Sequence, residues 1–197
     1  MNYKTLPKGY RFAGTMEFTR NRKQILAMFK LSIALVVIPA AIGLAICPPW
    51  VPLRELGRHW PMWLITAAML IAYIPLHELT HGIVMHALSG VRPTYGFKLP
   101  YAYAGSTVWF DRRSHILTAL APVVLWGIIL QVLICTLPGR WFWPLWLTQI
   151  SNLSGSAGDI YCVWYLMRME GDLLIQDTGV RMRIYRKTAP PAEEKNP

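Results

Sequence analysis

The stretch that decides the fold is residues 60–88, which read WPMWLITAAMLIAYIPLHELTHGIVMHAL. No charged residue occurs from Trp60 to Leu76, and the apolar pattern continues through His77, Glu78 and His81 until Ser89-Gly90. A helix needs about 20 mostly apolar residues to cross a bilayer. The stretch therefore predicts a membrane-spanning helix that carries His77, Glu78 and His81 within its length.

Three further apolar runs lie around this helix, at residues 31–53, 116–137 and 141–167. The last run is interrupted by a polar segment at residues 151–159, which lipid would not tolerate unless protein or a water-filled cavity surrounded it. The whole chain has 197 residues, of which 54% are hydrophobic and 15% are charged. Soluble domains carry about 25% charged residues. We expect an all-α integral membrane protein with about four transmembrane helices.

The distribution of basic residues predicts how these helices are oriented. The net charge is +10, and Lys and Arg accumulate in the N-terminal segment, in the loop at residues 92–113 and in the C-terminal tail. Because such an excess marks the cytoplasmic side of membrane proteins, we expect a multi-pass protein of the cell membrane with both termini cytoplasmic. Its partners would be the lipid bilayer and a membrane protein or peptide substrate. The excess flanks apolar runs, so we expect no nucleic-acid partner.

The same reading divides the chain into three parts. Residues 1–28 form a basic cytoplasmic N-terminal segment, residues 29–169 form the membrane domain, and residues 170–197 form a short cytoplasmic tail. Within the membrane domain, the loop at 92–113 alternates apolar and polar residues on either side of Ala104-Gly105-Ser106, which predicts a small cytoplasmic β-hairpin. A second two-stranded unit is expected around Asp177-Thr178-Gly179.

The polar residues of the deciding stretch form the pattern HExxH. His77 and His81 are four residues apart, so they share one helix face and can bind a single Zn²⁺. Glu78 lies between them, where it can take a proton from an attacking water molecule. Ionisable groups inside a membrane span are costly unless they are paired or bind metal. The sequence therefore predicts a hydrolytic zinc site.

A catalytic zinc has three protein ligands and an open position, so a third ligand must come from elsewhere. Asp159 is favoured because it lies 18 residues into its apolar run, a depth similar to that of the two histidines in theirs. Asp111, His86 and His115 remain alternatives, although His86 faces away from the other histidines on the helix. Asn152, seven residues before Asp159, is expected to donate to a developing oxyanion or to satisfy the interrupted helix.

These residues resemble a known family, the bacterial membrane-embedded zincin peptidases classed as domain of unknown function 3267, which are similar in mechanism to site-2 proteases. The resemblance rests on HELTHG at residues 77–82, ALAP at 119–122, SAGD at 156–159 and DTG at 177–179. It implies that His77, His81 and Asp159 bind zinc and that Glu78 is the catalytic acid and base. Asn152 matches only loosely. The Leu-Asp-Gly ending of site-2 proteases is missing.

Together the residues and the resemblance predict a zinc metallopeptidase that hydrolyses peptide bonds inside the membrane or at its surface, near the cytoplasmic face. The alternative is a membrane zinc-binding scaffold or regulator without catalysis. Glu78 favours hydrolysis, because a structural zinc site needs no general base and usually fills all four metal positions with protein ligands.

Overall fold

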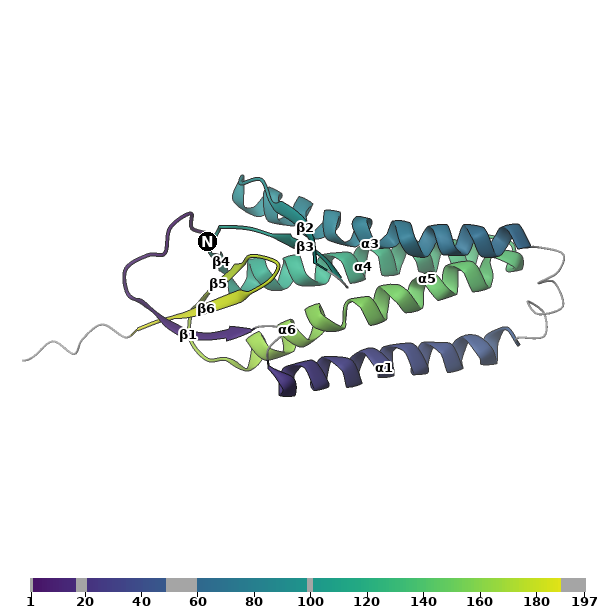
Figure 1. Cartoon of the computed structure of the whole chain (residues 1–197), viewed down its shortest axis with the longest axis horizontal. Coiled ribbons are helices and arrows are strands. Elements are labelled where there is room, and N and C mark those ends of the chain that lie inside the picture. Colours follow the sequence, from purple (N-terminus) through teal and green to yellow (C-terminus); the bar gives the residue numbers. More distant parts are fainter. Residues whose placement is uncertain (1, 17–20, 49–59, 99–100, 189–197) are drawn as a thin grey trace, which may run out of the picture.

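The computed structural model describes residues 2–16, 21–48, 60–98 and 101–188. It consists of a bundle of long helices with a four-stranded sheet at one end and a separate β-hairpin against the side of the bundle (Figure 1). The helices are α1 (Arg22–Ile46), α3 (Trp60–Ser89), α4 (Arg112–Thr136), α5 (Phe142–Gly155) and α6 (Ala157–Arg168), with a 3-10 turn, η1 (Gly139–Trp141), before α5.

The long helices begin and end where local chemistry requires. The side chain of Asn21 caps α1 by accepting from the backbone N–H groups of Lys23 and Gln24, and α1 ends just before Pro48. Asp111 caps α4 by accepting from the backbone N–H of Ser114 at 2.8 Å. Helix α1 contains Pro39 within its length and continues through it.

Three helices of the described chain, α1, α3 and α4, are long and apolar enough to cross a membrane. They have 25, 30 and 25 residues, which at about 1.5 Å per residue exceeds the roughly 30 Å of a hydrocarbon core. Many of their large apolar side chains are exposed, such as Val37, Ile71 and Ile128. These features indicate a membrane protein.

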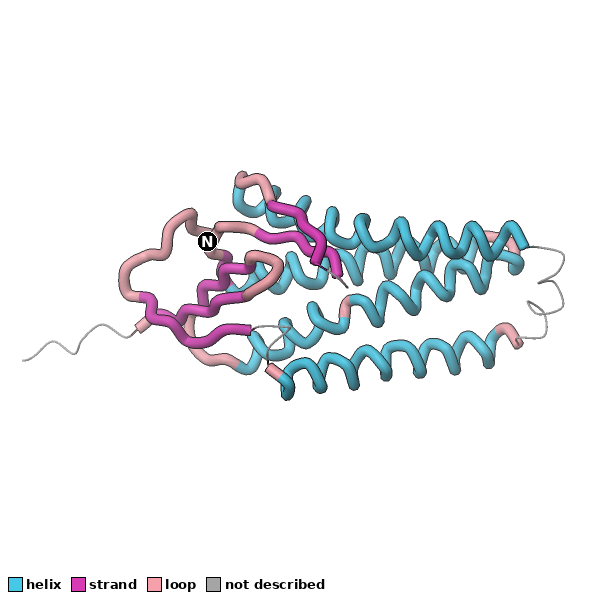
Figure 2. Tube along the Cα trace, viewed as in Figure 1, coloured by secondary structure: helices cyan, strands magenta, loops and turns pink. Residues whose placement is uncertain are grey.

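The prediction of an all-α protein with four spans is wrong. The fourth apolar run forms two short helices, α5 with 14 residues and α6 with 12, and each is shorter than a bilayer core. Ser156 separates them, and its hydroxyl donates back to the carbonyl of Asn152 at 2.8 Å. The chain also contains six strands in two sheets, so helices are not its sole secondary structure (Figure 2).

The larger sheet joins distant parts of the sequence. Its antiparallel order is β1-β6-β5-β4, formed by β1 (Tyr10–Met16), β4 (Phe110–Asp111), β5 (Leu173–Asp177) and β6 (Met182–Lys187). One face packs on α6 through a buried apolar cluster, which includes Met16, Leu166, Ile175, Met182 and Ile184. The sheet thereby fixes both ends of the described chain at one end of the bundle.

The β-hairpin is present, but its register differs from the prediction. β2 (Thr94–Lys98) pairs with β3 (Tyr101–Gly105), so the residues expected at the turn, Ala104 and Gly105, lie within a strand. The predicted partner strand, residues 107–110, instead leads into β4 of the larger sheet. The second predicted hairpin, around Asp177-Thr178-Gly179, forms as β5 and β6.

The structure shows which elements the expected terminal segments contain. The N-terminal segment at residues 1–28 contains β1 and the first turns of α1, and the tail at 170–197 contains β5 and β6. Both segments thus form one folded unit with β4. Expectations for residues 49–59, including the end of the first apolar run, lie outside the described residues.

Candidate metal centre

Helix α3 brings the HExxH pattern to the middle of the bundle. His77 and His81 lie one helical turn apart, and each is buried, with 7% and 8% of its surface exposed. Their Nε2 atoms are 3.1 Å apart. Since both rings come from one regular helix, the local sequence is sufficient to place them together.

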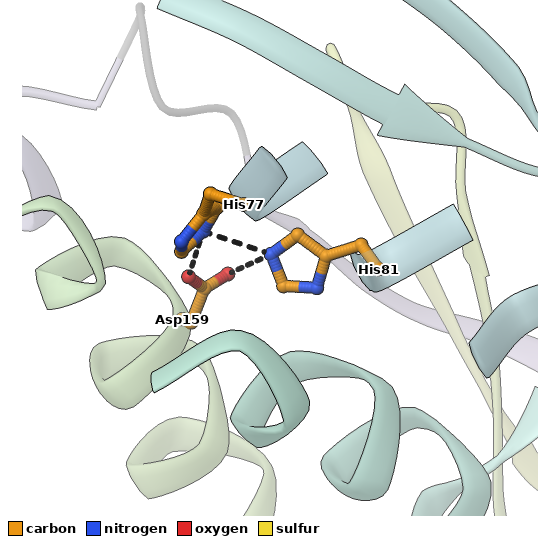
Figure 3. A group of neighbouring side chains, drawn as sticks. All are labelled: His77, His81 and Asp159. Carbon is orange, nitrogen blue, oxygen red and sulfur yellow. Dashed lines mark hydrogen bonds and ion pairs between the residues drawn. The ribbon is translucent and has the colours of Figure 1, made fainter. Parts of the chain in front are cut away.

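The third group of the cluster is Asp159, which comes from the first turn of α6. Its Oδ2 lies 3.3 Å from Nε2 of His77, and its Oδ1 lies 3.5 Å from Nε2 of His81. Figure 3 shows the three side chains converging on one point. Among the described residues, His77, His81 and Asp159 form the one group of at least three such side chains that could hold a metal ion.

The other nitrogen of each ring has a partner that assigns its proton. Nδ1 of His81 lies 2.9 Å from the carbonyl oxygen of Thr118, which can only accept. The hydroxyl of Tyr73 donates to Oδ1 of Asn152 at 2.6 Å and is 2.8 Å from Nδ1 of His77. Because its one proton is already used, this hydroxyl accepts from His77. Both Nε2 atoms are left with a lone pair facing the cluster.

These lone pairs test whether the residues fit a zinc ion. The lone pairs of the two Nε2 atoms and the carboxylate of Asp159 converge with no proton assigned between them. These electron-rich atoms repel one another unless a cation lies between them. Zinc bonds of about 2.0–2.1 Å at tetrahedral angles place neighbouring ligand atoms roughly 3.3 Å apart. The two Nε2 atoms are 3.1 Å apart, and the two oxygens of Asp159 lie 3.3 Å from Nε2 of His77 and 3.5 Å from Nε2 of His81. With one ligand atom taken from each residue, all three lie within 4.8 Å of one another. The donor set therefore fits zinc with three protein ligands and an open position.

Comparison with known proteins agrees with this chemistry. The model of family DUF3267, described as "putative zincin peptidase", matches residues 70–174, which is more than half of the chain. The chain belongs to this family. Searches of the curated proteins and of the solved structures found no match to this chain. Membership in a zincin family implies zinc as the metal, while the likeness to site-2 proteases stays a prediction.

In this zincin-family chain the cluster opens into a cavity of about 280 Å³. Glu78 lines the cavity next to His77, and so do the β3 residues Ala102, Tyr103 and Ala104. The predicted general base and the predicted ligands therefore share one space. Of the alternative ligands, His86 is exposed and its ring contacts Val91, and Asp111 caps α4. His115 lines the same cavity but is not part of the three-residue group.

Asn152 lies outside the lining of the cavity, where a residue that contacts the oxyanion would have to be. Its side chain is fully buried, its Oδ1 accepts from Tyr73, and its Nδ2 donates to the carbonyl of Val123 at 3.1 Å. Asn152 is not among the residues that line the cavity. The geometry favours a positioning role, in which Asn152 fixes Tyr73 and Tyr73 fixes the ring of His77.

Two positioning groups are not found by sequence reasoning. Tyr73 precedes His77 by four residues, so the helical period could have placed it on the same face. The carbonyl of Thr118 has no such signal, because any residue carries a carbonyl group. Its position depends on the packing of α4 against α3.

The hairpin is held over the cavity by tyrosine rings that pack on glycines. The hydroxyl of Tyr95 lies where a Cβ at Gly82 would be, and the ring of Tyr103 occupies the corresponding place at Gly179. Gly179 also has a φ of +79°, which glycine adopts without strain. These glycines, which follow HELTH and end the DTG stretch, therefore bring β3 close to the metal cluster.

Proposed function

We propose that this protein is a zinc-dependent membrane peptidase that hydrolyses peptide bonds near the cytoplasmic face. The observation that carries the proposal is that two imidazoles, a carboxylate and an additional glutamate share one cavity among helices of which α3 and α4 are apolar enough to cross a membrane. A purely structural zinc site would need neither the open ligand position nor Glu78. The decisive experiment is the comparison of wild type with Glu78→Gln, treated in the Discussion.

Each residue has a chemical task in this proposal. His77, His81 and Asp159 would hold the zinc, which when bound supplies Lewis-acid polarisation of the scissile carbonyl. Glu78 accepts a proton from the attacking water and returns it to the leaving amine. The contacts to Tyr73 and to the carbonyl of Thr118 keep the two rings in the tautomer that presents Nε2.

The edge of β3 that faces away from β2 and lines the cavity supports binding of an extended substrate. The backbone N–H of Ala104 faces the carboxylate of Glu78, and the carbonyl oxygen of Ala104 faces Gly179. The N–H and the C=O of Ala104 therefore both point away from β2. Residues two apart in a strand present their backbone groups to the same edge, which places those of Ala102 on the cavity side as well. A peptide could therefore pair with β3 by strand addition.

Ala102→Pro is expected to lower cleavage about five- to tenfold while the zinc content stays near that of wild type, because one backbone donor to the substrate is lost. Cleavage rates and metal analysis of the purified variants measure this, with Ala102→Ser as the control that keeps the N–H. Equal loss of zinc and cleavage would show misfolding and contradict the edge.

The sheet and its charges support one orientation in the membrane. β1 and β6 are paired, so the N-terminal and C-terminal segments lie on the same side, and this sheet exposes Arg11, Arg183, Arg186 and Lys187. Positive residues favour the cytoplasmic side. We infer that the sheet, and with it both terminal segments, is cytoplasmic.

This orientation predicts which single cysteines react with an impermeant thiol reagent added outside intact cells. In a variant lacking Cys47, Cys135 and Cys162, Gly139→Cys at the far end of the bundle should be labelled, because a side chain there meets no other atom within 4 Å. Thr188→Cys should be labelled only after the cells are opened. External labelling of Thr188→Cys would reverse the orientation.

A further inference from the structure

The cavity continues from the metal cluster toward the larger sheet, where it is lined by three side chains that the cluster does not use. These are His115 of α4, Cys162 of α6 and Asp177 at the end of β5. Asp177 belongs to the extramembrane sheet, so that sheet contributes directly to the walls of the cavity.

His115 is buried, with 3% of its surface exposed, and its hydrogen bonding is incomplete. Within the described part of the chain, Nδ1 has no hydrogen-bond partner. Nε2 lies 3.6 Å from the sulfur of Cys162 and 4.0 Å from Oδ2 of Asp177, and the second distance is too long for a hydrogen bond. Buried polar groups in native proteins are rarely left this way. Among the described residues, Nδ1 thus has no partner, and Nε2 has only the long contact with the sulfur of Cys162, which a substrate carbonyl could replace.

Asp177 cannot easily move closer to Nε2 of His115, because two hydrogen bonds hold the residue in place. Its Oδ1 accepts from the backbone N–H of Gly179 at 2.8 Å, and its carbonyl accepts from the backbone N–H of Ser106 at 2.7 Å. Desolvation by burial raises the pKa of its carboxyl to about 6, which leaves it mostly ionised at neutral pH. The carboxylate is therefore a fixed acceptor that favours a proton on Nε2 of His115.

A donor and an acceptor held side by side match the backbone of an extended peptide. In a β-strand, the N–H and C=O of one residue point to the same edge, and a neighbouring strand binds them with one acceptor and one donor. Nε2–H of His115 and Oδ2 of Asp177 offer this combination 4.0 Å apart. They lie on walls of the cavity other than β3, whose edge facing away from β2 lines the same space.

We propose that His115 and Asp177 form a backbone clasp. When a substrate strand pairs with β3 along one of its edges, the clasp binds the N–H and C=O of a substrate residue on the opposite edge. The clasp rests on the proposed peptidase function and extends it. The substrate would then be an extended segment that is hydrogen-bonded to β3 along one edge and to His115 and Asp177 along the other. Because these bonds are to backbone groups, recognition at this point would not depend on the substrate's side chain.

The test uses a matched pair of variants in the full-length protein carrying Glu78→Gln, so that bound substrate is not cut. The probe is fluorescein-labelled casein, an unfolded protein with many extended segments, and its binding is measured by fluorescence anisotropy. His115→Met removes the N–H and should weaken binding about tenfold, the effect expected for one lost hydrogen bond to a polarised partner. His115→Gln is nearly the same size, keeps an N–H near the position of Nε2, and should bind within threefold of the parent.

His86→Met is the control, because His86 is exposed and does not line the cavity, and it should leave binding unchanged. The pair Asp177→Asn and Asp177→Leu repeats the comparison on the acceptor, so the result does not depend on one variant folding. Equal binding by Met and Gln at 115, with zinc content retained, overturns the clasp while wild-type cleavage of casein leaves the peptidase intact. Absence of both binding and cleavage overturns the peptidase and, with it, the clasp.

Discussion

Glu78→Gln is expected to abolish peptide cleavage while the protein keeps its fold and about one zinc per chain. The amide is nearly the same size as the carboxylate and leaves His77, His81 and Asp159 in place, but it cannot accept the proton of the attacking water. Loss of a general base usually lowers a rate by about 10² to 10⁴. Because Glu78 would also return the proton to the leaving amine, we expect the upper end of this range.

The measurement is turnover of a membrane-inserted or unfolded protein substrate by purified wild type and variant at matched zinc content. Glu78→Asp, which keeps a carboxylate on a shorter side chain, serves as the comparison and should retain part of the activity. Wild-type turnover by Glu78→Gln would remove the hydrolase proposal. The non-catalytic zinc scaffold would then be the better account of this site.

Loss of any of the three ligands is expected to lower zinc affinity by more than a hundredfold. His77→Ala, His81→Ala and Asp159→Ala each leave two protein ligands, whereas catalytic zinc sites use three. The positioning residues should matter less: Tyr73→Phe and Asn152→Leu remove contacts that hold the ring of His77, and such changes typically cost about 10- to 100-fold in affinity. Competition with a zinc chelator of known affinity measures both classes.

His86→Ala is the matched control for these variants. It removes a histidine from the same helix, but one that is exposed and outside the cluster, and the zinc affinity should not change. Full zinc occupancy in Asp159→Ala, together with loss in Asp111→Ala or His115→Ala, would show that the ligand set is wrong. A large loss of cleavage without loss of zinc in Asn152→Leu would instead support the original expectation that Asn152 contacts the oxyanion.

The features that sequence reasoning placed correctly are those that local residues dictate. The helical period alone brings His77 and His81 to one face, and unbroken apolar length alone indicates the helices α1, α3 and α4. The prediction that Asp159 lies with these histidines came from counting residues along two apolar runs. That count held because α6 continues along the bundle after α5 (Figure 1), with backbone hydrogen bonds from Ser156 to Asn152 and from Ile160 to Ser156 across the break.

The features that were missed depend on contacts between distant residues. Alternation within the loop at 92–113 shows that strands are present, but it does not show which residues pair. Phe110 accordingly joins β5 and not the hairpin. Likewise β1 pairs with β6 across almost the whole chain, and short polar strands give no local signal of a partner so far away.

By itself, then, the sequence determined the apolar helices, the HExxH face and the candidate zinc chemistry, because each is a property of neighbouring residues. Tertiary structure alone decided that Asn152 binds Tyr73, that β3 presents its edge to Glu78, and that the sheet carries Asp177 to His115. These arrangements depend on the packing of α4, α6 and the strands. That packing buries polar groups, and buried polar groups are stable only when they form hydrogen bonds. Such pairings are set by the whole fold and are invisible in any short stretch of sequence.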